Sequence, residues 1–367
     1  MSSPPASLPL TRASVEAAYE LIKPYIHETP VLTNTTLSQL ASTPRTPAEL
    51  EGTEWAGQNP AKPVLRLWFK CENLQRIGAF KARGAFHAIE RLKQEPGWEE
   101  GGGRLKGVVT HSSGNHAQAL ALAARTNNIP AHIVMPTISA PAKIAATKGY
   151  GANVVFSGST SVEREAVTAT VIAETGARLI PPYDHPNIIL GQATASFELL
   201  SQLPPSTTLS GIITPLGGGG LLSGTALTCS STSVKVFGAE PSFQGADDGR
   251  RGYLSGERIP AVSTLTIADG LRTPVGAIPW SIIYERRLVS GIYSVSEAQI
   301  RAALRLVYER MKLVVEPSAV VGLAVALYNE EFRAMVERQG GAQGWDLGII
   351  FSGGNVSLEA LGKLFSD

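Results

Sequence analysis

The sequence has few cysteines and no long apolar segment, and these absences narrow its class. Cys71 and Cys229 are the only cysteines among 367 residues, and they form neither a CxxC pair nor a zinc-binding spacing. We expect both to be small buried hydrophobic residues. No apolar run approaches the roughly 20 residues that a membrane span requires. The N-terminus lacks the basic and apolar regions of a secretory signal. We therefore expect a cytoplasmic protein.

Charge of either sign is also scarce. Charged residues make up 17% of the chain, and the formal net charge is +1. Without a block of Lys and Arg, the sequence indicates neither a nucleic-acid partner nor an anionic membrane. The apolar fraction of 43% is typical of a globular protein. The length exceeds what one typical hydrophobic core supports, so we expect two domains.

Apolar runs alternate with helical patterns along most of the chain. The runs are followed at once by Gly or polar residues, as in parallel sheets that are buried on both faces and carry ligand loops at their carboxyl ends. A helix is expected from Ser14, with Ser14 as its cap, and residues 42–62 are expected to form a surface loop. The Ser- and Pro-rich residues 1–12 are expected to be poorly ordered. The remaining expected strands are 65–69, 107–112, 131–136, 152–158, 211–216, 234–240 and 347–355, and the remaining expected helices are 116–125, 141–151 and 162–176.

Four loops contain residues that could bind a ligand or take part in catalysis. The first is Gly-Ala-Phe-Lys-Ala-Arg-Gly at 78–84, which contains Lys81. Lys81 stands beside Phe80, among small residues and without an adjacent acid. A lysine in an apolar pocket has a lowered pKa and can form a Schiff base with a carbonyl compound. The alternative is an ordinary surface lysine at the start of a helix.

Two further loops carry hydroxyl and amide groups. The run Ser112-Ser113-Gly114-Asn115-His116 precedes a helix, where free backbone N–H groups can bind a carboxylate. The alternative is a capped helix with nothing bound. Near the C-terminus, Ser352 lies in the run 351–355, where an expected strand ends in a glycine turn and could present the hydroxyl to a ligand. The alternative is a simple β-turn.

The remaining loop contains four consecutive glycines, Gly217, Gly218, Gly219 and Gly220, and then Leu221. Ordering four glycines costs much backbone entropy on folding. Such a run is expected where the backbone must approach a phosphate closely, because glycine has no side chain in the way. No register fits the dinucleotide fingerprint G-x-G-x-x-G, and the loop has no Walker lysine. The loop therefore predicts phosphate binding, but not of NAD or ATP.

Together the four loops resemble the fold type II family of pyridoxal-phosphate-dependent serine/threonine dehydratases, and most closely its serine racemase branch. The resemblance covers roughly residues 14–367, apart from 42–62. It implies an α/β fold like that of the tryptophan synthase β chain, in which two domains each have a mainly parallel sheet flanked by helices. The large domain would comprise 1–100 and 188–367, and the small domain 101–187. Further matching stretches are HETPVL (27–32), KCENLQ (70–75), DHPNIILGQAT (184–194), TIADGL (266–271) and ERMKLVVEPSA (309–319).

The resemblance also implies roles for individual residues. Lys81 would form the Schiff base with pyridoxal 5′-phosphate and act as the base on one face of it, and Ser113 would be the acid on the other face. The other cofactor contacts would be Phe80 beside the ring, Asn115 at the ring hydroxyl, Ser352 at the pyridine nitrogen, and Gly217, Gly218, Gly219, Gly220 and Leu221 at the phosphate. The substrate would meet Ser112, Ser113, Gly114, Asn115, His116 and Arg164.

A divalent cation, Mg²⁺ or Ca²⁺, is implied as well, with Glu240, the Ala246 carbonyl and Asp248 as oxygen ligands. The segment is two residues longer here than in the family pattern, and an acidic turn is the alternative. A nucleotide effector is a weaker implication, because Arg76 replaces an expected lysine while Tyr150 matches an aromatic residue. The family also implies a homodimer.

Three functions remain open on the sequence. The first is racemisation of serine together with dehydration of serine or threonine. The second is dehydration of another β-hydroxy amino acid, such as 3-hydroxyaspartate, in a specialised biosynthetic pathway. The third is a catalytically idle binding module, which the intact Lys81, glycine loop and Ser352 disfavour.

Overall fold

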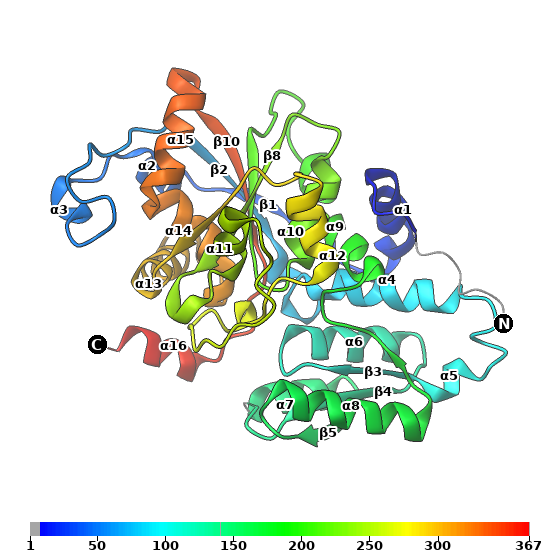
Figure 1. Cartoon of the computed structure of the whole chain (residues 1–367). Helices are drawn as coiled ribbons and strands as arrows, with labels where there is room; N and C mark the ends of the chain where they lie inside the picture. Colours follow the sequence, from blue (N-terminus) through cyan, green and yellow to red (C-terminus); the bar gives the residue numbers. More distant parts are fainter. Residues whose placement is uncertain (1–7, 140, 367) are drawn as a thin grey trace.

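The protein is built around two β-sheets, as the computed structural model in Figure 1 shows. The structure describes residues 8–139 and 141–366. Much of the N-terminal segment that we expected to be poorly ordered, residues 1–7, lies outside these ranges. Arg12, which that segment also included, already belongs to the first helix.

The larger sheet has six strands in the order β1-β2-β10-β7-β8-β9. All neighbouring pairs are parallel except β1 with β2. The expected strands of this sheet are confirmed, whereas β1 and β9 were not predicted because neither is a marked apolar run. The strands are β1 (Val31–Thr33), β2 (Leu65–Cys71), β7 (Gly211–Pro215), β8 (Lys235–Pro241), β9 (Gly291–Val295) and β10 (Trp345–Phe351).

Helices cover both faces of this sheet. Successive residues of β7 point to opposite faces, so that Ile213 packs in one core and Ile212 in the other. The core with Ile213 is covered by α2 (Thr35–Ser42), α13 (Glu297–Leu306), α14 (Val321–Tyr328), α15 (Glu330–Gly340) and α16 (Leu358–Phe365). The core with Ile212 is covered by α1 (Arg12–Ile22), α9 (Pro186–Ser201), α10 (Gly220–Cys229) and α12 (Ala277–Trp280), while α11 (Asp248–Ser255) follows β8.

The smaller sheet is parallel throughout, in the order β5-β4-β3-β6. Helix α4 packs on α6 beside this sheet and also on α9 of the larger part, so it joins the two. All four strands lie within 101–187, although the domain boundaries themselves stay a prediction. The elements are β3 (Val108–His111), β4 (Ala131–Pro136), β5 (Asn153–Ser157), β6 (Arg178–Leu179), α4 (Lys81–Lys93), α5 (Gly103–Lys106), α6 (Asn115–Thr126), α7 (Pro141–Gly149) and α8 (Ser161–Thr175).

One local prediction was wrong and another was incomplete. Helix α1 is capped by Thr11 rather than Ser14, because the Thr11 side chain accepts a hydrogen bond from the Ser14 backbone N–H. The insertion 42–62 is more than a surface loop, since it contains the short helix α3 (Pro47–Leu50). Its ends are held by the buried Arg333, which donates to the carbonyls of Thr43 at 2.7 Å and Ala61 at 3.4 Å.

Within the described ranges, no helix combines the length and apolarity that crossing a bilayer requires.

Candidate active site

Lys81 is the first residue of α4, and its side chain is partly buried. Its Nζ donates a hydrogen bond to the carbonyl of Pro182 at 2.6 Å and lies 5.3 Å from the centre of the Phe80 ring. Burial lowers the pKa of Lys81 to about 8. This direction agrees with the expectation for a lysine among apolar neighbours, and at pH 7 about one tenth of such an amine is neutral.

A buried ionic cluster holds the start of α4. The guanidinium of Arg83 donates to both carboxylate oxygens of Glu72 at 2.7 Å, and also to Glu198. All three side chains are buried, so each charge depends on the others for compensation. Since Glu72 precedes the Lys81 loop and Arg83 lies within it, two residues after the lysine, this pair anchors the segment that presents the lysine.

The turn that contains Ser352 lies directly against the Lys81 loop. The Phe80 N–H donates to the Ser352 carbonyl at 3.0 Å, and Ala79 pairs with Gly353 in an isolated β-bridge. The Gly354 N–H donates to the Gly78 carbonyl at 2.9 Å. The Lys81 loop and the Ser352 turn, which are far apart in the chain, thus lie against each other.

Asn115 connects the loop before α6 to the Ser352 turn. Its Nδ2 donates to Glu316 Oε1 at 2.9 Å, and its Oδ1 accepts from Asn355 Nδ2 at 2.8 Å. Burial, and then the charge of Asp269, raises the pKa of Glu316 to about 7. Sequence reasoning gave no role to Glu316 or Asn355, although both stand in stretches that carried the resemblance.

The other residues of that loop are arranged around the start of α6. The Gly114 N–H donates to Ser112 Oγ at 3.3 Å, and Ser113 lies between them. His116 is buried, with its Nε2 3.2 Å from the Ile180 carbonyl. Burial, and then the charge of Lys81, lowers the pKa of His116 to about 3, so its ring is neutral. The neutral ring therefore lies buried against the Ile180 carbonyl, while the backbone of His116 belongs to the first turn of α6.

The glycine loop connects β7 to α10 and leaves no room for a side chain at Gly218 or Gly219. Gly219 has a φ of 90°, and a Cβ there would lie 2.6 Å from the Cβ of Pro279. A Cβ on Gly218 would lie 2.2 Å from the ring of Tyr183. Bare backbone at the start of a helix is what a phosphate cradle requires, so the loop fits the phosphate of the cofactor.

One segment borders both Lys81 and the glycine loop, and the sequence marked only its last part, from Asp184, as a matching stretch. It connects β6 to α9 and contains Pro182, which accepts the hydrogen bond from Lys81, and Tyr183, which covers Gly218. Its next residue, Asp184, accepts hydrogen bonds from the Ala277 and Ile278 N–H groups at 2.9 Å each. No local pattern marks Pro182 or Tyr183, because their roles depend on contacts between distant parts of the chain.

Comparison with known proteins identifies this arrangement. The family model for pyridoxal-phosphate dependent enzymes matches residues 51–341. The chain belongs to this family. It is 41% identical to a serine racemase of Dictyostelium discoideum over 97% of this chain and 98% of that protein. It is 39% identical to the L-threo-3-hydroxyaspartate ammonia-lyase of Saccharomyces cerevisiae over 97% and 96%. The structure of maize serine racemase matches with a TM-score of 0.82, 38% identity and coverage of 96% of each chain.

Membership of the pyridoxal-phosphate-dependent enzymes makes the chain an enzyme of fold type II, as the resemblance implied. Serine racemases and an ammonia-lyase are among its relatives. A partly buried lysine, a side-chain-free glycine loop and a hydroxyl turn beside the lysine fit the cofactor of this family.

Arg164, the predicted substrate contact outside these loops, lies on α8. Its guanidinium donates to the Ser159 carbonyl at 3.5 Å. Burial, and then the charge of Arg164, lowers the pKa of His111, the residue before Ser112. The arginine is therefore near the strand end that leads into the substrate loop.

The three predicted metal ligands lie between the end of β8 and the start of α11. Glu240 is buried and accepts hydrogen bonds from the N–H groups of Gly249 at 3.0 Å and Arg250 at 2.8 Å. Burial raises the pKa of Asp248 to about 6. Burial and the charge of Asp248 raise the pKa of Glu240 well above its usual value.

The third predicted ligand, Ala246, is also buried and lies two residues before Asp248. In the described part of the chain, no three His, Cys, Asp or Glu side chains cluster as a metal site. Two buried acids and one carbonyl are nevertheless a donor set suited to a hard cation.

Proposed function

We propose that the enzyme racemises serine and dehydrates L-serine or threonine to the 2-oxo acid and ammonia. The observation that carries this proposal is the partly buried Lys81, with its pKa lowered to about 8, beside the Ser352 turn. The similarity of nearly the whole chain to serine racemases supports it.

The proposed roles are those that the resemblance to this family implies, and the contact between the Lys81 loop and the Ser352 turn supports them. Bound pyridoxal phosphate supplies an electron sink for charge at the α-carbon of the substrate. Lys81 would hold the cofactor and take the α-proton. Gly217, Gly218, Gly219, Gly220 and Leu221 would hold the phosphate through backbone N–H groups, Phe80 would pack beside the ring, and Asn115 would donate to the ring hydroxyl.

Ser352 bears on which reaction is favoured. A hydroxyl at the pyridine nitrogen does not keep that nitrogen protonated as a carboxylate does, so negative charge at the α-carbon is less stabilised. Loss of the β-hydroxyl as this charge develops is then favoured, which supports elimination from a hydroxy amino acid.

Ser112, Ser113, Gly114, Asn115 and His116 would form the cradle for the substrate carboxylate, with Arg164 nearby. Within this loop, Ser113 is the proposed acid on the face opposite Lys81. Racemisation requires proton transfer on both faces of the α-carbon, whereas elimination from L-serine requires only the Lys81 face.

The test is Ser113→Ala, with Ser112→Ala as the matched control in the same loop. We expect Ser113→Ala to remove the interconversion of L- and D-serine, to spare pyruvate formation from L-serine largely, and to reduce it from D-serine. The assay follows chirality and 2-oxo acid release in the same samples. Normal racemisation by the Ser113→Ala variant would refute the assignment of the acid.

A second candidate is dehydration of 3-hydroxyaspartate, because the ammonia-lyase relative of Saccharomyces cerevisiae is as similar as the racemases are. A screen of hydroxy amino acids with the purified enzyme distinguishes the two. Turnover of 3-hydroxyaspartate far above that of serine, without racemisation, would favour the second candidate.

Several properties of the assembly belong to the same proposal. The enzyme would bind Mg²⁺ or Ca²⁺ through Glu240, the Ala246 carbonyl and Asp248, and the buried pair of acids supports this. It would act as a cytoplasmic homodimer. A nucleotide effector would bind near Arg76 and Tyr150.

A further inference from the structure

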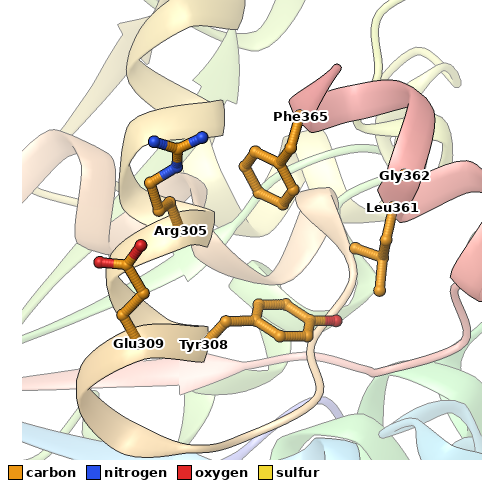
Figure 2. Close-up of a pocket in the computed structure, with 6 residues that line it drawn as sticks. All are labelled: Arg305, Tyr308, Glu309, Leu361, Gly362 and Phe365. Atoms are coloured by element: carbon orange, nitrogen blue, oxygen red, sulfur yellow. The ribbon is translucent and has the colours of Figure 1, made fainter.

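A hollow outside the candidate active site lies between the C-terminal helix α16 and the end of α13. It has a volume of about 470 Å³ and is lined by Arg305, Tyr308, Glu309, Leu361, Gly362 and Phe365. Figure 2 shows the five larger side chains around one common space. A π-helical turn, Val307–Met311, extends α13 and contributes Tyr308 and Glu309. Its volume is within the usual range of small-molecule sites, roughly 300–1,000 Å³.

The lining combines two opposite charges with an apolar surface. The Arg305 guanidinium lies 5.3 Å from the centre of the Phe365 ring. Arg305 and Glu309 are one helical turn apart, yet within residues 8–139 and 141–366 neither side chain forms an ion pair. The Tyr308 hydroxyl is already used, because it donates to the Val315 carbonyl at 3.0 Å. Its ring and the buried Leu361 therefore offer mainly apolar contact.

We propose that this hollow binds an apolar α-amino acid in its zwitterionic form as an effector. The carboxylate would pair with Arg305, the ammonium group with Glu309, and the side chain would pack against Phe365, Tyr308 and Leu361. A guanidinium suits a carboxylate because it presents several N–H donors in one plane. A single cation beside a single carboxylate matches a zwitterion better than a polyphosphate, which would require several positive charges.

The position of Tyr308 connects this site to the catalytic residues. Its hydrogen bond ends at Val315, and the next residue, Glu316, accepts the hydrogen bond from Asn115. A ligand that packs against Tyr308 therefore contacts the segment that orients Asn115. Because a ligand shifts activity only through contacts that differ between two states, the coupling must be measured as a change in turnover.

The probe is L-phenylalanine, whose ring fits beside Phe365 and Tyr308 and which has no β-hydroxyl to eliminate. We expect saturable binding of one molecule per chain in calorimetry with the cofactor-free enzyme, whose active site has no aldehyde to react with the amine. We expect 3-phenylpropanoate, which lacks the ammonium group, to bind at least ten-fold more weakly. Binding that is lost when the cofactor is removed would place phenylalanine in the active site and overturn the proposal.

Three substitutions test the hollow itself. Arg305→Gln and Glu309→Gln should each weaken binding at least ten-fold, whereas Arg301→Gln, an exposed arginine one turn earlier on α13, should not. Gly362→Leu should abolish binding, because a Cβ at Gly362 meets no atom within 4 Å and the added side chain can occupy the hollow. Unchanged binding in Gly362→Leu would refute the site.

The effector role is decided by turnover of serine. Phenylalanine should change the turnover of the wild type by at least two-fold and leave that of Gly362→Leu unchanged. If phenylalanine binds in the hollow without any effect on turnover, the effector role is wrong. Light scattering should give the same mass for Gly362→Leu and wild type. A changed mass would show that a second copy of the chain covers the hollow, which would also overturn the proposal.

Discussion

Replacing Gly219 by alanine tests the phosphate cradle at the point where the loop is most constrained. Gly219 has a φ of 90°, in the left-handed region that non-glycine residues rarely adopt. A Cβ at this position would also lie 2.6 Å from the Cβ of Pro279, which is closer than real Cβ contacts. Gly220 is the matched comparison, because it has no positive φ and a Cβ there would lie 3.5 Å from Tyr183, an ordinary contact.

The magnitude follows from these two terms. A left-handed conformation costs a non-glycine residue roughly 1–2 kcal/mol, and overpacking costs roughly 1–3 kcal/mol. Relief of this strain requires the loop to move away from the position that suits the phosphate. If the whole cost, about 2–5 kcal/mol, is taken from cofactor binding, the affinity decreases about 30-fold to 5,000-fold.

The assay is titration of the cofactor-free protein with pyridoxal phosphate, followed by absorbance, together with urea unfolding of the same samples. We expect Gly219→Ala to bind far more weakly than wild type and Gly220→Ala to stay within a few-fold of it. A Gly219→Ala protein that loses stability but keeps full cofactor affinity would show that the loop is only structural, and would refute the cradle.

Three further predictions follow from the site. Lys81→Ala should lose turnover and the near-visible absorbance of the lysine-bound cofactor, and a variant that keeps both would refute the assignment. Chelation should lower the melting temperature, and Mg²⁺ or Ca²⁺ should restore it, because a cation that binds only the folded state stabilises it; unchanged melting and activity after chelation would exclude the cation. Glu316→Gln tests a pH effect. Because the folded pKa of Glu316 is raised to about 7, the stability that its carboxyl group contributes is lost as the pH rises through 7. Between pH 6 and 8 the unfolding free energy of the wild type should therefore decrease by about 1 kcal/mol more than that of Glu316→Gln. An equal decrease in both proteins, measured by urea unfolding at the two pH values, would contradict this.

The sequence predicted the central strands of both sheets because strands buried on both faces are continuous apolar runs. Their carboxyl ends then indicated where the loops with Asn115, Gly217 and Ser352 would lie. The short strands β1, β6 and β9 were missed. Strand β6 has only two residues, Arg178–Leu179, which is too short for an alternating or apolar pattern. It is a strand only because it pairs with β3.

The parts of the site that were missed depend on distant contacts. Glu316 appears in the sequence as an isolated acid, and only the fold places it against Asn115 and Asn355. Tyr183 has no motif around it, yet its ring lies against Gly218. Periodicity and spacing report on neighbours in the chain, so contacts between loops of different strands leave no such signal.

The hydrogen bond to the Pro182 carbonyl is compatible with Lys81 as a neutral, nucleophilic amine. At pH 7 an amine with a pKa of about 8 is neutral in about one molecule in ten, whereas an amine with the ordinary value near 10.5 is neutral in fewer than one in a thousand. The hydrogen bond to Pro182 keeps the buried nitrogen paired in either protonation state, because both the ammonium and the neutral amine can donate. No carboxylate is among the causes of the pKa shift, and a negative partner would raise the pKa again. A neutral acceptor therefore satisfies the lysine without making it a weaker nucleophile.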